Sequence, residues 1–322
     1  MTGRAPAPAG VLLMAYGTPE KPEQVEAYFT HIRGGRTPSP QSVDRLRRRY
    51  ERVGGRTPLL EITEEVRCAL EQDLNGRDGS AYRVYAGMKH WHPFIGDVMP
   101  RIAKDGVDRV IALALAPHFS RISIGGYRKA VDDSHAALGN PMDVTFVESW
   151  HLQPEFLDLI AMLTRSALAK FPAEEREHVV AVFSAHSLPQ RIREWNDPYE
   201  SQLLESSAAI AQRAGLRDWR FAWQSAGNTG EPWLGPDIVD YIGTLHSEGV
   251  RSVLQIPVGF VSDHLEILYD LDIKAREKAG ELGMRYERTG MPNARPEFIR
   301  TLAAVVHGAV RTSEAPVIAR VR

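Results

Sequence analysis

The chain has 322 residues, of which 43% are hydrophobic and 25% charged, and its formal net charge is -2. This length leaves room for two domains of ordinary size, and the composition is that of a folded globular protein rather than a disordered or fibrous one. The nearly balanced charge gives no electrostatic reason to expect a nucleic-acid partner. No apolar run approaches the ~20 residues that a membrane-spanning helix needs, so we expect no membrane insertion.

Only one cysteine, Cys68, is present. A disulfide, a cysteine-only zinc site and an iron–sulfur cluster within the chain are therefore excluded. The first ten residues, MTGRAPAPAG, lack the apolar core of a signal peptide. We expect a cytoplasmic protein with flexible tails at residues 1–9 and 313–322.

Strand patterns alternate with amphipathic helical patterns along the chain. The strands are predicted at 11–16, 82–86, 110–116, 144–148, 179–184, 220–223, 252–260 and 284–287. The helices are predicted at 24–32, 43–53, 62–74, 94–104, 127–138, 154–171, 199–214, 236–248, 263–282 and 296–310. Such alternation predicts a parallel α/β architecture. Because the link near 149–154 divides the strands four and four, we favour two lobes, 10–150 and 151–312, over a closed eight-stranded barrel.

The two halves also resemble each other in short stretches. MAYGTP at 14–19 is similar to SAHSLP at 184–189, and 115–119 is similar to 255–260. Either similarity alone is short enough to arise by chance, but together they favour two similar lobes. We therefore predict that Tyr16 and His186 face each other across a cleft between the lobes, where ligands commonly bind.

The stretch 251–274 places carboxylates after a buried strand. Asp263 is predicted as an N-cap, with Glu266 completing a capping box. On the helix that follows, Asp263, Glu266 and Asp270 share one face. The residues predicted to pack inward are Leu265, Leu268 and Ile273. Taken alone, this stretch also fits a capped helix with a solvated acidic face, but open α/β sheets bind ligands at this end of their strands.

A second strand delivers His186 to the same kind of position, beside Ser184 and Ser187. Many such histidines are hydrogen-bonded core residues. A histidine that joins carboxylates at strand ends, however, indicates a metal site or a proton-transfer site. Histidine and carboxylate ligands suit divalent iron.

The first half supplies a basic region between residues 33 and 56. It contains Arg33, Arg36, Arg45, Arg47, Arg48, Arg49, Arg52 and Arg56. Arginine matches carboxylate geometry, and although most of these side chains fit a solvated helix face, Arg33 and Arg49 are the better candidates for binding an anion. Tyr127 follows two glycines at a helix start, where an anion is favoured. An anion-binding region together with a metal-handling pair suggests a reaction that joins a metal to an anionic ligand.

These features resemble the ferrochelatases, and specifically the compact coproporphyrin ferrochelatases of Gram-positive-type bacteria. The similar segments are LLMAYGTP (12–19), YFTHIRGGRTP (28–38), RRYERVGGRTPL (48–59), LAPHFS (115–120), VFSAHSLP (182–189), WQSAGNT (223–229), PWLGPD (232–237) and PVGFVSDHLEILYD (257–270). The resemblance covers nearly the whole chain. It implies an α/β fold of two Rossmann-like lobes, each a four-stranded parallel sheet flanked by helices, with the active-site cleft between them.

The resemblance also implies roles for individual residues. Tyr16 contacts one face of the macrocycle and ligates the iron of the product. His186 and Glu266 bind the metal and accept protons on the opposite face, and they are the predicted catalytic pair. The residues that hold the porphyrin and its propionates are Arg33, Arg49, Tyr50, Thr57 and Tyr127. The chain departs from the family at Lys274, which replaces the next residue of an acidic row and puts an outer metal site in doubt.

The activity implied is the insertion of ferrous iron into coproporphyrin III, a lyase reaction of haem biosynthesis that yields Fe-coproporphyrin III. Fe²⁺ and coproporphyrin III are then substrates, and we expect a monomer with transient contact, if any, with neighbouring haem-pathway enzymes. A protoporphyrin IX ferrochelatase is the nearest alternative, although Tyr16 and the short length oppose it. A cobalt chelatase and a non-catalytic haem carrier remain open, whereas a dinucleotide-binding protein is disfavoured because no G-x-G-x-x-G follows an early strand.

Overall fold

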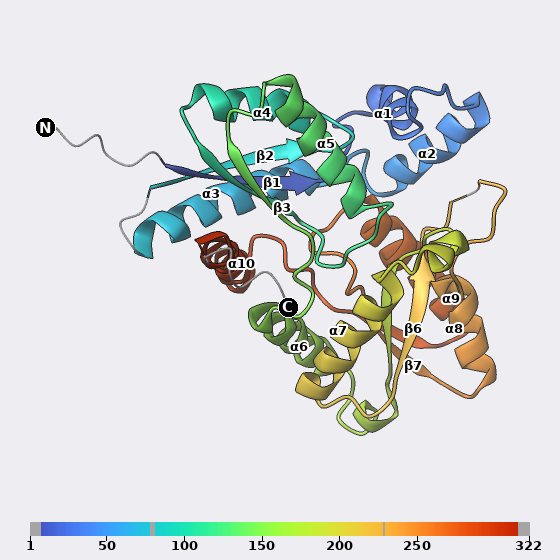
Figure 1. The fold of residues 1–322 in the computed structure, drawn as a ribbon. Helices are drawn as coiled ribbons and strands as arrows, with labels where there is room; N and C mark the ends of the chain where they lie inside the picture. The colour runs from blue at the N-terminus through green and yellow to red at the C-terminus, as the bar shows by residue number, and fades with distance from the viewer. Residues whose placement is uncertain (1–7, 78–80, 228, 315–322) are drawn as a thin grey trace, which may run out of the picture. The chain divides into compact units, whose positions relative to one another are not determined.

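The computed structural model describes residues 8–77, 81–227 and 229–314, and it contains two four-stranded parallel sheets (Figure 1). The strand orders are β2-β1-β3-β4 and β6-β5-β7-β8. The strands are β1 (Ala9–Ala15), β2 (Tyr82–Met88), β3 (Arg109–Ala114), β4 (Asp143–Val147), β5 (Val180–His186), β6 (Trp219–Gln224), β7 (Ser252–Ile256) and β8 (Arg285–Arg288). The predicted fold class, two four-stranded parallel sheets flanked by helices, is confirmed.

Helices occupy the regions between the strands. They are α1 (Val25–Ile32), α2 (Pro40–Arg52), α3 (Leu59–Arg77), α4 (Ile95–Lys104), α5 (Ile124–Ala137), α6 (Pro154–Leu168), α7 (Tyr199–Ala214), α8 (Ile238–Ser247), a π-helix (Glu266–Ala275), α9 (Arg276–Glu281) and α10 (Pro296–Glu314). Short 3₁₀ segments lie at Pro22–Gln24, Arg176–His178 and Gln190–Trp195.

Several predicted boundaries differ from the observed ones by a few residues. The strand predicted at 252–260 ends at Ile256, because Pro257 has no N–H to donate to a neighbouring strand. The tails predicted at 1–9 and 313–322 lie mostly outside the described residues, but Ala9 already belongs to β1 and α10 continues to Glu314.

The chain forms two compact units that are not continuous in sequence. The first unit holds residues up to Thr18, Leu60–Glu155 and the segment from Ala294, and the second holds Pro19–Leu59 and Phe156–Asn293. The predicted lobe boundary at residue 150 lies close to Glu155, after which the chain passes from the first unit to the second. The segment Pro19–Leu59, in contrast, belongs to the second unit, where Val25 and Tyr50 share a small core with Leu265 at the start of the π-helix.

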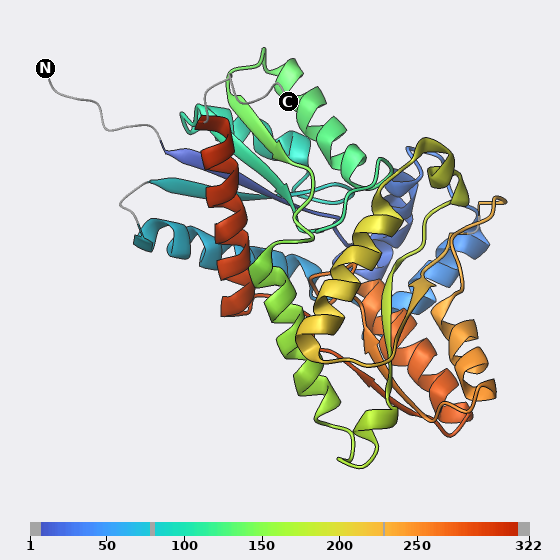
Figure 2. The same ribbon diagram turned by 60° about the horizontal axis from the view of Figure 1, so that its bottom comes forward.

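Each sheet is covered by helices of its own unit. In the first unit, α4 and α5 pack over β1 and β3 through a core that includes Leu12, Met99 and Val131, and α10 packs on β3 and β4 (Figure 2). In the second unit, Ile242 of α8 and Leu271 of the π-helix share a core with the strands. The parallel strands of each sheet therefore bring their carboxyl ends to one edge.

The registers of the two sheets can be compared directly, because β1 and β5 occupy the same place in the strand order. When Met14 is aligned with Ser184, the stretches 14–19 and 184–189 coincide, and Leu13 corresponds to Phe183. Leu13 pairs with Leu113, and Phe183 pairs with Ile256. The stretches 115–119 and 255–260 both lie at the carboxyl ends of corresponding strands, β3 and β7, but in this register their similarity is offset from that of the first pair of stretches.

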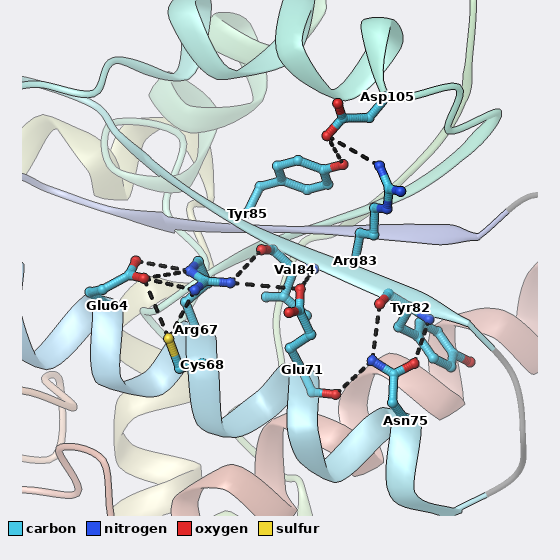
Figure 3. Close-up of polar contacts among 10 residues, drawn as sticks. All are labelled: Glu64, Arg67, Cys68, Glu71, Asn75, Tyr82, Arg83, Val84, Tyr85 and Asp105. Atoms are coloured by element: carbon cyan, nitrogen blue, oxygen red, sulfur yellow. Dashed lines mark hydrogen bonds and ion pairs between the residues drawn. The ribbon is translucent and has the colours of Figure 1, made fainter.

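Helix α3 binds the outer edge of the first sheet through side chains (Figure 3). The amide of Asn75 accepts from the Tyr82 N–H at 2.8 Å and donates to the Tyr82 carbonyl at 3.0 Å. At Val84, the N–H donates to Glu71 at 2.7 Å, and the carbonyl accepts from Arg67 at 3.1 Å. Because β2 is the last strand in the order of this sheet, these side chains bond its outward-facing backbone groups, which protects the edge against further strand addition.

Candidate active site

The second unit brings His186 and Glu266 into contact. His186 is the last residue of β5, and its Nε2 lies 3.3 Å from Oε1 of Glu266. The His186 Nδ1 is hydrogen-bonded to the carbonyl of Ser187. Each side chain is roughly 30% exposed, so the pair is accessible to a ligand while most of its surface is enclosed by protein.

The two groups shift each other's titration in opposite directions. Burial by itself would lower the pKa of His186, but the charge of Glu266, its hydrogen bond and the Ser187 carbonyl outweigh burial and raise that pKa to about 9. Burial would raise the pKa of Glu266, whereas His186 and then His264 hold it well below its ordinary value. At neutral pH the resting pair is therefore an imidazolium beside a carboxylate.

Three further side chains of the second unit surround this pair, and the sequence predictions did not include them. Nε2 of His264 lies 3.4 Å from Oε2 of Glu266, and the Trp233 ring centroid lies 6.3 Å from that of His186. The Tyr199 hydroxyl donates to the His186 carbonyl at 3.1 Å. Sequence signals were available for His264, which lies two residues before Glu266, and for Trp233, which lies in the similar segment PWLGPD. Tyr199 lies in no such segment and gave no signal.

The helix that carries Glu266 differs from the prediction. Asp263 is not its N-cap: the Asp263 carboxylate accepts from Asn293 at 2.7 Å and from Arg288 at 3.3 Å. From Glu266 to Ala275 the chain forms a π-helix, which has more residues per turn than an α-helix and is frequent at functional sites. The residues of this π-helix that are fully buried against the core are Ile267, Leu271 and Ala275. Of the predicted inward residues, Leu265 is buried in the small core, whereas Leu268 and Ile273 are only half-buried, because the prediction assumed a period of 3.6.

Asp270 is buried and surrounded by donors. Nη2 of Arg49 donates to both of its oxygens, at 3.1 and 2.9 Å, and the Ser225 hydroxyl donates at 2.5 Å. Nζ of Lys274 lies 4.0 Å away, and the Arg49 guanidinium stacks on Tyr269 with its centre 4.7 Å from the ring centroid. Two cations of the chain thus already balance the charge of Asp270, which works against an outer metal ion at this carboxylate.

The other predicted porphyrin-binding residues of this segment lie in different environments. Arg33 caps the end of α1 and is exposed, with its guanidinium 5.8 Å from the Phe29 ring centroid. Tyr50 is 2% exposed and belongs to the small core beside Leu265, and Thr57 is also buried. The charges of Arg33 and Arg49 are therefore accessible to a ligand, whereas Tyr50 and Thr57 are buried beneath the surface.

In the first unit, Tyr16 directly follows β1 and is 41% exposed. Its ring lies 4.6 Å from that of His90, measured between centroids. Tyr127 is buried, and its burial together with nearby Tyr16 raises its pKa above the ordinary value. Nζ of Lys89 lies 5.1 Å from the Tyr127 ring centroid, and burial lowers the Lys89 pKa to about 8. Lys89 and His90 were missed, although they follow β2 at the carboxyl edge where such residues are expected.

Across residues 8–77, 81–227 and 229–314, no helix is both long and apolar enough to cross a membrane. Within the same described ranges, no three His, Cys, Asp or Glu side chains are grouped as a metal site. His186 and Glu266 are side chains of types that bind divalent metals, and two ligands leave coordination positions for others.

Comparison with known proteins identifies the family and supports the fold. The ferrochelatase family model matches residues 8–310. A ferrochelatase of Herpetosiphon aurantiacus is 51% identical over 302 residues, which are 94% of this chain and 99% of that protein. A coproporphyrin III ferrochelatase of Bacillus subtilis is 44% identical over 299 residues, which are 92% of this chain and 96% of that one. The solved structure of SirB from Bacillus subtilis with Fe³⁺ shares the fold, with a TM-score of 0.58 at 10% identity and coverage of 95% and 97%. With a match to the family along almost its whole length, this chain belongs to the ferrochelatase family.

Proposed function

We propose that this protein inserts Fe²⁺ into coproporphyrin III, giving Fe-coproporphyrin III for haem biosynthesis. The observation that carries the proposal is the contact between His186 and Glu266 at 3.3 Å in a chain of the ferrochelatase family. The choice of porphyrin is supported by relatives named coproporphyrin III ferrochelatase that are 44% and 45% identical over 92% of this chain.

His186 and Glu266 are proposed as the residues that receive the iron. Because the His186 pKa is raised to about 9, the imidazole is protonated at neutral pH and must lose that proton before it binds a metal. Binding of Fe²⁺ therefore releases a proton from the pair. Two protein ligands suit an ion that has to be passed on, since structural metal sites close all positions and catalytic sites leave some open.

The same pair is proposed to handle the pyrrole protons. Iron replaces two N–H protons of the macrocycle, and a nearby base accelerates such a transfer. Once His186 has given up its resting proton, it is able to accept another. Oε2 of Glu266 lies 3.4 Å from Nε2 of His264. His264 is therefore proposed as the next acceptor for a proton that leaves the pair.

The remaining residues are proposed to bind the porphyrin. Tyr16 is exposed and supplies an oxygen for the product iron. Arg33 and Nη1 of Arg49 are suited to propionates, because guanidinium groups pair well with carboxylates. Tyr50, Thr57 and Tyr127 act through the shape of the surface, as their burial suggests.

The test is parallel insertion of Fe²⁺ into coproporphyrin III and protoporphyrin IX by the purified chain. We expect kcat/KM to be at least about tenfold higher with coproporphyrin III, because one charge-assisted hydrogen bond to an extra propionate contributes about 1.5–3 kcal/mol. Protoporphyrin IX is the second candidate, since the relative that is 51% identical is named only as a ferrochelatase. Equal efficiency with both porphyrins would favour it. A cytoplasmic location and a monomeric state are proposed as well, and fractionation and gel filtration test them.

A further inference from the structure

Three polar side chains lie inside the sheet of the second unit, on three adjacent strands. They are Ser184 of β5, Gln224 of β6 and Gln255 of β7, and none of them is exposed to solvent. Strands of a parallel sheet covered on both faces are normally apolar, and a buried polar group is unfavourable unless it is hydrogen-bonded. Their presence at one end of this sheet therefore requires an explanation.

The three side chains form a continuous hydrogen-bonded chain with one direction. Nε2 of Gln255 donates to Oγ of Ser184 at 2.6 Å, and Oγ of Ser184 donates to Oε1 of Gln224 at 2.8 Å. Nε2 of Gln224 then donates to the backbone carbonyl of Glu266 at 3.1 Å. The hydroxyl gives its single hydrogen to Gln224, so the Gln224 amide nitrogen is left facing Glu266. We call Gln255, Ser184 and Gln224 the polar chain.

The polar chain ends on the backbone carbonyl of Glu266, one member of the candidate catalytic pair, and its last residue pairs in the sheet with the other member. Gln224 is the register partner of His186 across β5 and β6, and its backbone carbonyl accepts from the Ser187 N–H at 2.7 Å. Its side chain meanwhile reaches Glu266. One residue therefore contacts the backbone on both sides of the 3.3 Å contact between His186 and Glu266.

The backbone at Glu266 is a place where outside support matters. Glu266 is the first residue of the π-helix, and the loop before it is held by Asn293 and Arg288 through Asp263 rather than by a helix cap. A side-chain donor from the sheet fixes this first turn relative to β5. Fixing the backbone of Glu266 fixes the origin of its side chain and hence the distance of its carboxylate from His186.

We propose that Gln255, Ser184 and Gln224 are positioning residues that hold Glu266 against His186, and that they act on metal insertion through Glu266 without touching either substrate. The reaction itself rests on the proposed function, whereas the positioning is a property of the chain alone. A simpler view is that the three residues only stabilise the sheet.

The test compares Ser184→Ala, which interrupts the polar chain, with Ser206→Ala. Ser206 is an equally buried serine of the same unit whose hydroxyl bonds the Leu203 carbonyl within α7. In Ser184→Ala we expect kcat for metal insertion to fall about tenfold, equivalent to about 1.4 kcal/mol, with KM for the porphyrin and porphyrin binding little changed. Ser206→Ala should keep the wild-type kcat, and Ser184→Thr, which retains the hydroxyl, should restore most of it. If Ser184→Ala proves too unstable, Gln255→Met breaks the first link only and should give a smaller loss of kcat.

A double-mutant cycle with Glu266→Gln separates positioning from general stability. If the polar chain acts through Glu266, Ser184→Ala should add little to the loss already caused by Glu266→Gln. Losses that multiply independently would overturn the proposal, as would wild-type kcat in both Ser184→Ala and Gln255→Met.

Amide hydrogen exchange gives a readout that needs no substrate. Residues 266–271 should exchange faster in Ser184→Ala and at the wild-type rate in Ser206→Ala, because only the first variant removes the hydrogen bond that orients the Gln224 amide toward the Glu266 carbonyl. A wild-type protein that inserts iron into neither porphyrin would refute the proposed function, yet faster exchange in this segment would still support positioning. Unchanged exchange at 266–271 would overturn the positioning proposal whatever the activity.

Discussion

The two sheets have the same strand order, but they use polar side chains in different ways. In the first unit, Asn75, Glu71 and Arg67 reach the outer backbone of β2 from α3 (Figure 3), and their hydrogen bonds end on the sheet itself. In the second unit, the polar chain crosses the interior of the sheet and ends on the backbone of Glu266. The first network closes an edge of the fold, and the second leads to the candidate active site.

The strand pairing shows which residues of the first sheet occupy the positions of the polar chain. With Met14 aligned to Ser184, the pairing of β1 with β3 and of β5 with β7 places Ala112 where Gln255 lies. Met14 and Ala112 are as fully buried as Ser184 and Gln255. A sheet of this order is therefore built without polar groups at these positions. The polar residues at these positions of the second sheet are therefore not required for folding of the sheet. Their hydrogen bond to the backbone of Glu266 explains them better.

The largest effect on metal insertion should follow from removing the imidazole of His186 in the candidate active site. His186→Ala should lower metal insertion by ~100-fold or more, the lower end of what a positioned proton-transfer residue contributes, while porphyrin binding persists. Steady-state insertion assays and porphyrin fluorescence titration measure the two properties separately. His178→Ala, which changes an exposed histidine of the same unit, is the matched control. Near-normal turnover in His186→Ala would favour a haem carrier over an enzyme.

The next effect concerns the titration of the ligand-free pair. In wild type the His186 imidazole should titrate with a pKa of about 9, as followed by NMR of its ring. Glu266→Gln removes the largest of the effects that raise this pKa, so burial dominates and the pKa should fall to or below the ordinary value of 6.5.

The raised pKa of His186 has a consequence for stability. A pKa that is higher in the folded than in the unfolded chain stabilises the fold fully below pH 6.5, and this contribution is lost as pH rises through about 9. Wild type should therefore lose stability between these values by on the order of 1 kcal/mol or more, because a tenfold change in a proton-binding constant corresponds to about 1.4 kcal/mol. Glu266→Gln should show less of this loss. Asp270 and Tyr199 also lie near the His186 segment. Identical pH slopes in wild type and Glu266→Gln would mean that groups other than Glu266 dominate the pH dependence.

A further prediction sharpens the contrast with the hydrogen bonds between α3 and the edge strand β2. Asn75→Leu removes two hydrogen bonds to Tyr82 and should lower the free energy of unfolding by ~1–3 kcal/mol, at about 0.5–1.5 kcal/mol for each bond. Chemical denaturation measures this change. Asn75→Asp keeps the acceptor and should lose about half as much. The kcat of the folded fraction should not change in either variant, and a loss of kcat at unchanged stability would erase the distinction between the two networks.

Sequence reasoning reached the fold because its signals are local. Alternating strand and helix patterns located the strands of both sheets, and the two motifs after β5 and β7 pointed to His186 and Glu266. It did not reach the π-helix, since a period of 3.6 was assumed, and so it misassigned Asp263 and Leu268. Nor did it reveal that residues 19–59 belong to the second unit or that Gln255, Ser184 and Gln224 are hydrogen-bonded to one another. These depend on contacts between segments far apart in the chain, which no local pattern records.

The smallest effect concerns the choice of porphyrin and tests whether Arg49 belongs to the surface or to the interior of the second unit. Its Nη2 is occupied by Asp270, and its side chain is 29% exposed, so only part of the guanidinium is free for a propionate. Arg49→Ala should reduce the preference for coproporphyrin III over protoporphyrin IX by about tenfold or less, near the lower end of a charge-assisted contact. Ratios of kcat/KM for the two porphyrins measure this preference.

Arg52→Ala is the control for that ratio, because Arg52 lies on the same helix, pairs with Glu277 and also stacks on Tyr269. It should leave the preference unchanged. If Arg49 acts only by holding Asp270 and the π-helix, Arg49→Ala should slow insertion into both porphyrins equally, and Arg49→Lys should recover part of the rate by keeping a cation beside Asp270. An equal loss would therefore remove Arg49 from propionate binding and assign it, like Gln224, to the support of the helix that carries Glu266.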